Sequence, residues 1–337
     1  MLELITHPVF LIVLCVIVAL IASGLFMWVL SYFVASYLVY VKTLKRRSKD
    51  DWGRTISDTN DPELKEMYEQ GFAWHDANIS YKKDVHIENN GLNLYGEYYD
   101  FGSDRCVMIL SGRTESLVYG YYFAIPYAKN GCNVLVLDPR GHGLSDGEYN
   151  TTGFEESKDD IAWVKFLQKE FNIRSVIFHG ICIGAAGGMY ALTSGECPDC
   201  VEAIVTEGMF ANFYESMKNH LIERKKPTFI MTDLINAWMK RYTGHSMKVG
   251  PIDVIQKLDR PLLMLHSKED LYSVEEYAQK LYDKAGCENK KIVWFDHGRH
   301  SMLRITDTER YDSAITDFLR ELSEAKNTVE REKENVL

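Results

Sequence analysis

Charged residues are missing from the start of the chain: no aspartate, glutamate, lysine or arginine occurs between Leu4 and Val41. Residues 9–31 within this stretch are almost wholly apolar. About 20 apolar residues in a helix are enough to cross the hydrocarbon core of a bilayer. The sequence therefore predicts an N-terminal transmembrane helix, with residues 1–41 as the membrane anchor.

A basic segment before the apolar run is also missing. A cleaved signal peptide combines a positively charged start with an apolar run of about 7–15 residues, so this segment is expected to be retained as an anchor. Basic residues instead follow the run, at Lys42, Lys45, Arg46, Arg47 and Lys49. Because basic flanks of a membrane helix stay on the cytoplasmic side, we expect a single-pass protein of the cell membrane with its main domain in the cytoplasm.

The sequence also lacks a positive net charge and a disulfide framework. The formal net charge of −10 argues against nucleic-acid binding. The seven cysteines are odd in number and fall mostly within expected strands and helices, as in proteins of a reducing compartment. Cys197 and Cys200 form a C-x-x-C pair, but no second pair accompanies them to bind zinc, and their role stays open.

The rest of the chain divides by composition. Residues 42–80 predict a basic juxtamembrane linker with a helix near residues 62–71, and residues 326–337 predict a charged tail. Between them, residues 81–325 alternate expected strands with expected helices, which predicts a mostly parallel sheet covered by helices on both faces. A Met- and aromatic-rich stretch, about residues 208–258, interrupts the alternation and predicts a small helical cap.

The alternation consists of short apolar runs that suit buried strands and longer amphipathic runs that suit helices. A hairpin is expected at the start, because Asn90-Gly91 favours a tight turn between two strands. The expected strands are residues 83–88, 92–99, 106–110, 132–137, 175–178, 201–205, 261–266 and 291–295, and the expected helices are residues 119–129, 154–171, 274–284 and 308–325.

Serine is missing where a familiar motif would place it. The strand over residues 175–178 runs into Gly180-Ile181-Cys182-Ile183-Gly184, which is a G-x-S-x-G nucleophile elbow with cysteine at its centre. Such a turn forces the central residue into a strained backbone, and glycines must flank it. The thiol would lie exposed at the start of a helix, which favours negative charge. A structural cysteine in a glycine-rich turn is the alternative.

Two later strands end in residues that could serve this nucleophile. In an elbow architecture the acid and then the histidine follow the nucleophile, each just after a strand. The strand over residues 261–266 leads to Glu269 and Asp270, and the strand over residues 291–295 leads to His297 and His300. Motif spacing favours Asp270 over Glu269 and His300 over His297.

Four motifs then agree in order and context. They are Ser111-Gly112-Arg113, the D-x-R-G-x-G-x-S loop from Asp138 to Ser145, the elbow, and the H-x-x-x-D and G-x-H-S strand ends. From about residue 80 to 325 the chain resembles the α/β-hydrolase superfamily, with the α/β-hydrolase fold. Its Ser-Gly-Arg-Thr-Glu-Ser loop resembles that of bacterial lysophospholipase-like hydrolases and esterases, although the superfamily more often has His-Gly there and serine at the elbow.

The resemblance implies a role for each matching residue. Cys182 would be the nucleophile, His300 the general base and Asp270 the acid that orients it. The backbone N–H groups of Ile183 and Arg113 would form the oxyanion hole. No metal or organic cofactor is implied. His142 and His179 are expected to pack near the site without acting in the reaction.

The implied reaction is hydrolysis of an ester or thioester of an apolar or lipid-like acyl group through an acyl-cysteine. Because an acceptor other than water could resolve that intermediate, acyl transfer is an alternative, and a non-catalytic binding protein on the same fold is another. Arg113 could contact an anionic head group or form an ion pair with Glu115.

Overall fold

The computed structural model describes residues 8–56, 58 and 60–334; residues 1–7 of the predicted anchor and 335–337 of the predicted tail lie outside the described residues. The strands are β1 (Lys82–Asn89), β2 (Leu92–Tyr99), β3 (Arg105–Leu110), β4 (Asn133–Leu137), β5 (Ser175–Ile181), β6 (Val201–Glu207), β7 (Leu262–Ser267) and β8 (Lys290–Phe295). The helices are α2 (Pro8–Leu44), α3 (Pro62–Ala77), α4 (Leu117–Lys129), α5 (Glu156–Phe171), α6 (Ile183–Thr193), α7 (Phe213–Glu223), α8 (Met231–Thr243), α9 (Glu275–Lys284), α10 (Leu303–Thr306) and α11 (Thr308–Glu334), with short 3₁₀ turns η1 (Ile79–Tyr81), η2 (Pro251–Asp253) and η3 (Ile255–Lys257).

The strands form one sheet in the order β1-β2-β4-β3-β5-β6-β7-β8. Strands β3 to β8 run parallel, while β1 and β2 pair antiparallel and β2 joins β4 antiparallel. The predicted hairpin is confirmed: Asn89 pairs with Leu92, and Asn90 and Gly91 between them both have positive φ, as a tight hairpin turn requires. The carboxyl ends of the parallel strands therefore meet at one edge, where loops can build a site.

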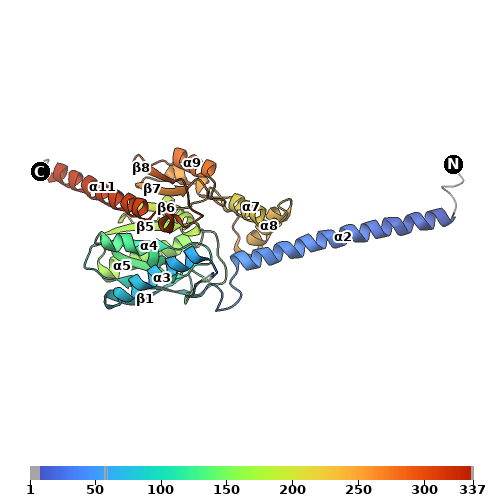
Figure 1. The fold of residues 1–337 in the computed structure, drawn as a ribbon, viewed down its shortest axis with the longest axis horizontal. Coiled ribbons are helices and arrows are strands. Elements are labelled where there is room, and N and C mark those ends of the chain that lie inside the picture. Colours follow the sequence, from blue (N-terminus) through green and yellow to red (C-terminus); the bar gives the residue numbers. More distant parts are fainter. Residues whose placement is uncertain (1–7, 57, 59, 335–337) are drawn as a thin grey trace.

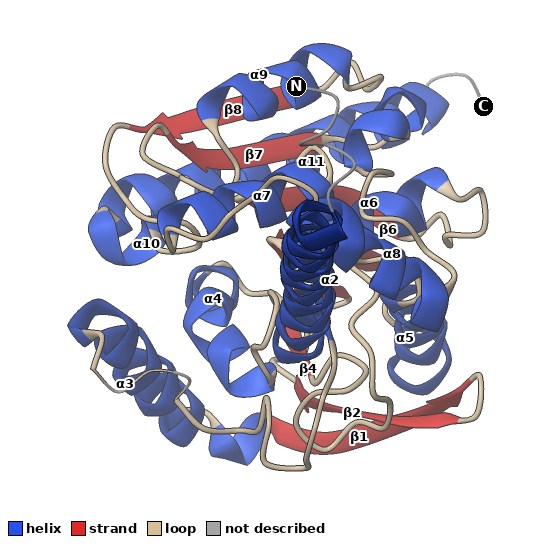
Figure 2. Ribbon diagram, turned by 90° about the vertical axis from the view of Figure 1, so that its right-hand side faces the viewer, coloured by secondary structure: helices blue, strands red, loops and turns tan. Residues whose placement is uncertain are grey.

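Helices cover both faces of the sheet, as predicted (Figure 2). Side chains alternate along each strand, so Val107 and Ile109 of β3 face one core while Cys106 and Met108 face the other. The first core also takes up α3, α4 and α11, and the second takes up α5, α6 and α9. The mostly parallel sheet between two helical layers is thus confirmed.

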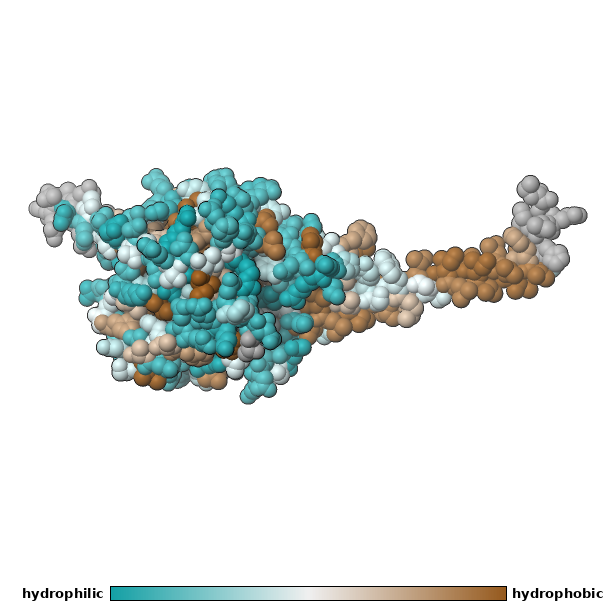
Figure 3. Space-filling view, in the orientation of Figure 1, coloured by the Kyte–Doolittle hydropathy of each residue, from teal (hydrophilic) through white to brown (hydrophobic). Residues whose placement is uncertain are grey.

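The long apolar helix α2 leaves the domain and points away from it (Figure 1). It is long and apolar enough to cross a membrane, which makes it a candidate membrane span. Residues 8–31 are exposed on all sides, and apolar side chains cover this part of the helix (Figure 3). By contrast, Tyr40 and Leu44 at its inner end are completely buried in the domain core.

The predicted cap consists mainly of α7 and α8, followed by η2 and η3. Helix α8 packs against the inner end of α2 through aromatic side chains. The Trp238 ring lies 4.7 Å from that of Phe33 and its indole N–H donates to the Ser36 hydroxyl at 3.0 Å, while Tyr242 stacks on Tyr40 at 5.6 Å. The anchor and the cap therefore form one packed unit.

The segment between the anchor and β1 is more closely packed on the domain than its polar composition suggests. Helix α3 starts at the Asp61 N-cap and buries Met67 and Tyr68 against α4, because its apolar positions share one face. Before it, the Arg46 guanidinium donates to the carbonyl oxygens of Gly143 and Ser145. At the other end of the chain, α11 continues to Glu334 through much of the predicted tail, since that stretch is rich in strong helix formers.

Candidate active site

Cys182 lies in the tight turn between β5 and α6. Its backbone has φ +51° and ψ −107°, a strained conformation for a residue with a side chain. The flanking glycines are required by space: a Cβ on Gly184 would lie 1.9 Å from the Leu110 carbonyl oxygen, and one on Gly180 would lie 2.4 Å from Cα of Ala185. This is the geometry predicted for a nucleophile elbow. Cys182 is only 8% exposed, so its thiol faces a cavity and not open solvent.

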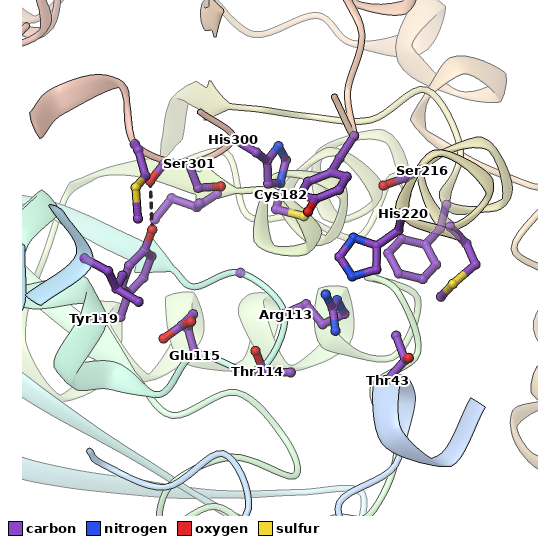
Figure 4. Close-up of a pocket in the computed structure, with 17 residues that line it drawn as sticks. Thr43, Arg113, Thr114, Glu115, Tyr119, Cys182, Ser216, His220, His300 and Ser301 are labelled. Atoms are coloured by element: carbon purple, nitrogen blue, oxygen red, sulfur yellow. Dashed lines mark hydrogen bonds between the residues drawn. The ribbon is translucent and has the colours of Figure 1, made fainter. Parts of the chain in front are cut away.

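Asp270 and His300 meet beside this turn, at the ends of β7 and β8. Nδ1 of His300 lies 2.6 Å from Oδ2 of Asp270. The other carboxylate oxygen, Oδ1, accepts the backbone N–H groups of Tyr272 at 2.8 Å and Ser273 at 2.9 Å. Both oxygens of Asp270 are thus held, and the imidazole is oriented with its Nε2 edge free to face Cys182 (Figure 4).

The competing carboxylate and histidine form a separate pair on the surface. Nδ1 of His297 lies 3.0 Å from Oε1 of Glu269, and the His297 side chain is 79% exposed. Neither residue lines the cavity. The structure therefore brings together Asp270, His300 and Cys182, as the motif spacing predicts, and leaves Glu269 and His297 outside.

Charge stabilises the histidine in its protonated form. Burial lowers the pKa of His300, but the Asp270 carboxylate and the neighbouring Cys182 outweigh burial and raise this pKa well above its usual value. Burial also acts on Asp270, where it would raise the pKa; His300 and the backbone donors outweigh it and lower the pKa of this carboxyl. An acid–histidine–thiol arrangement of this kind can transfer a proton between the sulfur and a leaving group.

The predicted oxyanion donors lie on both sides of Cys182. Ile183 is the first residue of α6, where backbone N–H groups have no intrahelical acceptor. On the other side, a Cβ on Gly112 would lie 3.6 Å from Cβ of Cys182, so the Gly112–Arg113 backbone runs against the cysteine. Among the described residues, no group accepts the N–H of Ile183 or Arg113. Both are available to a developing negative charge.

The cavity around Cys182 has a volume of about 210 Å³ and two unlike walls (Figure 4). The sheet wall comes from loops at the strand ends and comprises Gly112, Arg113, Thr114, Glu115, Ile181, Cys182, Tyr272, His300, Ser301 and Met302. The helix wall comes from α2, α3 and α7 and comprises Thr43, Leu64, Phe213, Ser216, Met217 and His220. Tyr119 of α4 also lines the cavity and donates to the Ser301 carbonyl oxygen at 2.9 Å.

Arg113 extends its half-buried side chain into the cavity near His220 (Figure 4). Within the part of the chain that the structure describes, no carboxylate lies within salt-bridge distance of its guanidinium. Of the two alternatives for Arg113, the ion pair with Glu115 is not formed; that carboxylate accepts the Tyr68 hydroxyl at 2.5 Å. Burial, with Arg113 and Arg224 nearby, lowers the pKa of His220 to about 3, so this histidine is neutral at pH 7.

Behind the sheet wall lies a buried polar network that the motifs do not indicate. The carboxylate of Glu207, at the end of β6, accepts the Tyr311 hydroxyl at 2.6 Å and the Leu303 backbone N–H at 3.1 Å. Tyr311 in turn lies 3.2 Å from Nε2 of His179, and burial raises the pKa of Glu207 to about 7. Leu303 follows His300 closely, so Glu207 helps to hold the histidine loop.

His142 and His179 have the predicted packing positions. His179 is completely buried on β5 and lies 2.8 Å from the Tyr127 hydroxyl. His142 is also completely buried, with its ring stacked on Trp52 at 4.6 Å. Burial lowers the pKa of His142 to about 4 and that of His179 to about 3, and neither lines the cavity.

The cysteine pair before β6 lies outside the site. Cys197 and Cys200 are both half-buried free thiols and do not line the cavity. Burial raises the pKa of Cys197 to about 12 and that of Cys200 to about 11, which disfavours the reactive thiolate. The environment of these two side chains is that of packed cysteines.

The sequence predicts the cap but does not identify the residues of the helix wall, or Glu207, as parts of the site. His220 and Met217 belong to the cap, whose amphipathic pattern shows only that one face is buried. Thr43 lies beyond the apolar run of the anchor, in a stretch predicted to be linker. Glu207 could have been noticed as a carboxylate at the end of a buried strand, which is a rare position for a charge.

Comparison with known proteins agrees with this geometry. Residues 106–234 match the family described as alpha/beta hydrolase fold. The uncharacterized protein YqkD of Bacillus subtilis is 27% identical over 223 residues, which cover 65% of this chain and 72% of that protein. Protein ABHD12B of Homo sapiens is 31% identical over 186 residues, covering 51% of this chain and 49% of that protein.

A solved structure extends the likeness to the fold. The esterase Pf2001 of Pyrococcus furiosus superposes with a TM-score of 0.62 at 23% identity, covering 74% of this chain and 94% of the esterase. The family match, the sheet order and the elbow at Cys182 all agree with this fold. The chain has the α/β-hydrolase fold, and its residues 106–234 match the family described by that name.

Proposed function

We propose that this protein hydrolyses an ester or thioester of an apolar acyl group through Cys182, His300 and Asp270. The observation that carries the proposal is their convergence: the strained elbow cysteine and His300 line one cavity, and His300 lies 2.6 Å from Asp270 behind it. The backbone N–H groups of Ile183 and Arg113, which have no acceptor among the described residues, lie on the two sides of Cys182. An α/β-hydrolase fold and esterase-like structural neighbours support hydrolysis, and the apolar side chains of the helix wall support an apolar acyl group.

The proposed reaction has two steps. The sulfur of Cys182 attacks the carbonyl carbon, a C–S bond forms, and the N–H groups of Ile183 and Arg113 stabilise the oxyanion. The bond to the leaving group then breaks, and His300 delivers the proton that came from the thiol. In the second step His300 takes a proton from water and the water oxygen attacks the acyl carbon. The C–S bond then breaks, the free acid leaves, and His300 returns the proton to the sulfur to regenerate the thiol.

The Arg113 side chain supports a further feature of the substrate. A guanidinium that extends into a cavity without a carboxylate partner is suited to a charge-assisted hydrogen bond with an anionic group. An ester with a carboxylate or phosphate near its scissile bond would supply that partner. This contact is a specificity feature and is not needed for the two chemical steps.

We also propose that α2 crosses the cell membrane once, with the catalytic domain in the cytoplasm. The basic cluster from Lys42 to Lys49 supports this orientation through the positive-inside preference. Protease treatment of intact and of permeabilised cells tests it. The domain should be degraded only after permeabilisation, and digestion in intact cells would show the opposite orientation.

The experiment uses the full chain in detergent micelles, because Tyr40 and Leu44 of α2 are part of the domain core. A panel of p-nitrophenyl acyl esters and acyl thioesters is assayed with the wild type and with Cys182→Ala, Cys182→Ser and His300→Ala. We expect Cys182→Ala and His300→Ala to lose about 10³-fold or more in kcat/KM, as nucleophile and base variants of hydrolases do.

Matched controls are His297→Ala and Cys200→Ser, which alter a histidine and a cysteine outside the cavity and should keep wild-type rates. Product analysis with an added alcohol or amine separates hydrolysis from acyl transfer to that acceptor. If the wild type turns over no substrate and a thiol probe does not prefer Cys182, the proposal is wrong and a binding role on the same fold replaces it.

A further inference from the structure

The loop between α7 and α8 combines exposed apolar and exposed basic side chains. We call residues 224–230, with the sequence Arg-Lys-Lys-Pro-Thr-Phe-Ile, the tip loop. Phe229 is 74% exposed and Ile230 is 42% exposed. Removing such side chains from water is favourable, so a surface that presents two neighbouring ones is suited to contact with an apolar phase.

The basic side chains of the tip loop have no internal partners. Arg224, Lys225 and Lys226 are all exposed, and no described residue forms a salt bridge with them. The two nearest acids in the sequence are engaged elsewhere: Glu223 accepts the Tyr272 hydroxyl, and Asp233 pairs with Lys248 at 2.8 Å. The tip loop thus presents uncompensated positive charge beside its apolar side chains, which is the composition of a membrane-surface contact.

The position of the tip loop agrees with a membrane contact. Residues 8–31 of α2 are exposed all round and correspond to roughly 36 Å of helix at 1.5 Å per residue. This length matches a hydrocarbon core of about 30 Å, so the membrane surface falls near the point where contacts with α8 begin. In Figures 1 and 3 the α7–α8 end of the cap is the part of the domain that reaches furthest along α2 toward its free end.

The backbone of the tip loop holds an unusual conformation. Lys225 has φ +53° and Ile230 has φ +60°, both in the left-handed region that residues with a side chain rarely adopt. A β-branched residue such as isoleucine is especially unfavourable there. Unfavourable backbone conformations persist at positions where they serve a contact, and here they flank the turn that directs Phe229 and Ile230 outward.

We propose that the tip loop is a second membrane-binding site, in which Phe229 and Ile230 insert into the bilayer that α2 crosses and the three basic side chains bind the phosphates of anionic lipids. The inference rests on the membrane placement of α2 within the proposed function. Helix α7, which precedes the tip loop, carries Met217 and His220 of the helix wall. The contact would therefore hold the cavity against the membrane surface, where an acyl substrate dissolved in the bilayer can enter.

The first test is independent of activity. The full chain with Cys182→Ala carries the photoreactive residue p-benzoylphenylalanine in place of Phe229 and is reconstituted into vesicles of equal parts phosphatidylcholine and phosphatidylglycerol. A matched control carries it in place of Ile79, which is 56% exposed in η1 beside β1. We expect lipid adducts on irradiation at position 229 and not at 79. Absence of lipid adducts at 229, or adducts to protein in their place, would overturn the proposal.

The second test separates the membrane contact from the chemistry. The charge variant Lys225→Glu/Lys226→Glu and the apolar variant Phe229→Ser/Ile230→Ser should hydrolyse water-soluble p-nitrophenyl acetate at the wild-type rate. On p-nitrophenyl palmitate dispersed in the same vesicles we expect the charge variant to be slower by about tenfold or more, since each basic residue near an anionic surface contributes roughly a factor of five. In vesicles of phosphatidylcholine alone this difference should shrink.

Equal rates of wild type and both variants on the vesicle-borne ester would count against a role of the tip loop in substrate access. If the wild type hydrolyses neither ester while position 229 still forms lipid adducts, the membrane contact stands and the proposed catalytic function fails. The two proposals are thus distinguishable.

Discussion

The two walls of the cavity hold their side chains in place by different physical means. The sheet wall depends on backbone geometry and buried charge: a strained elbow at Cys182, a carboxylate at Asp270 held by backbone N–H groups, and a second carboxylate at Glu207. The helix wall depends on apolar and aromatic packing among α2, α7 and α8, and its one titratable member, His220, is neutral at pH 7. The difference predicts that substitutions and pH affect the two walls in different ways.

The two walls also differ in how much their side chains can move. Strand ends in a hydrogen-bonded sheet can shift little, so groups placed there can keep reacting atoms within hydrogen-bond distance. The helix wall is built from α3, the membrane anchor and the cap, and the anchor and the cap contact each other through tilted aromatic rings such as Phe33 and Trp238. Side-chain packing of this kind can adapt to different acyl groups without moving the sulfur or the imidazole.

The largest effect is expected from Asp270→Asn in the sheet wall. The asparagine keeps the shape of the side chain but removes the charge that orients and stabilises protonated His300, so kcat/KM should fall by on the order of 10²–10⁴. Because the carboxylate is the main contribution that raises the pKa of His300, the ionisation of this histidine should move to lower pH. The pH profile of kcat/KM and the NMR titration of His300 measure both effects.

The matched control is Glu269→Gln, which removes the neighbouring carboxylate that pairs with His297 on the surface. It should leave the rate and the pH profile at wild-type values. If both substitutions lowered activity equally, the assignment of Asp270–His300 to the site and of Glu269–His297 to the surface would be wrong.

The sequence predicts the sheet wall well and the helix wall poorly, for physical reasons. Cys182, Asp270 and His300 follow short apolar strands and sit in motifs whose glycines and spacing reflect backbone requirements, so position along the chain fixes position in space. The strand and helix order follows from the same local patterns.

The helix wall depends on long-range packing that leaves no local signal. The apolar run of the anchor predicts a membrane span, but nothing in it shows that Tyr40 and Leu44 enter the domain core while Leu38 stays 60% exposed. Hydrophobicity is high on all sides of α2, so it cannot distinguish contact with lipid from contact with protein. The exposed part of α2 ends where its contacts with α8 begin, and these contacts are not visible in the sequence of α2 itself.

A large effect on the helix wall is expected from Tyr40→Ala at the inner end of α2. Tyr40 is completely buried against α8, so its truncation should lower the free energy of unfolding by about 3 kcal/mol, as for other buried aromatic residues. Leu38→Ala, at a largely exposed position of the same helix, should change it by less than about 0.5 kcal/mol. Denaturant unfolding of the full chain in micelles, followed by tryptophan fluorescence, measures both.

Tyr40→Phe refines this prediction. No described group forms a hydrogen bond with the buried Tyr40 hydroxyl, so removing it should leave stability unchanged or slightly higher. Equal losses for Tyr40→Ala and Leu38→Ala would show that the inner and outer parts of α2 do not differ in the way the structure indicates.

A pH-dependent effect on the free energy of unfolding is expected behind the sheet wall, at Glu207. Burial raises the pKa of Glu207 to about 7 from about 4.5 in an unfolded chain. Between these values the folded protein keeps a proton that the unfolded chain loses, so this residue lowers the free energy of unfolding as pH rises from about 4.5 to about 7, by up to roughly 3 kcal/mol. Above pH 7 the contribution is constant.

Glu207→Gln should remove this slope, so the variant should gain stability relative to the wild type as pH rises through the same range. The difference in the free energy of unfolding between the wild type and Tyr40→Ala, at the inner end of α2, should stay constant with pH. Unfolding curves at several pH values test both, and a Glu207→Gln difference that does not vary with pH would contradict a buried, titrating carboxyl at this position.

The smallest effect is expected from Ser36→Ala at the contact of α2 with α8. The Ser36 hydroxyl accepts the Trp238 indole N–H at 3.0 Å and donates to the Phe33 carbonyl oxygen at 2.7 Å, and Ser36 is completely buried. Its removal leaves the indole N–H without its acceptor, so the free energy of unfolding should fall by about 1 kcal/mol.

Ser31→Ala is the matched control. Ser31 also donates to a carbonyl oxygen of its own helix, that of Trp28 at 2.7 Å, but it lies in the exposed part of α2. Thermal unfolding of the full chain measures both variants. A loss of stability in Ser36→Ala but not in Ser31→Ala would place the boundary between the lipid-facing and the protein-facing part of α2 between these two serines. Equal stability of the two variants would contradict such a boundary.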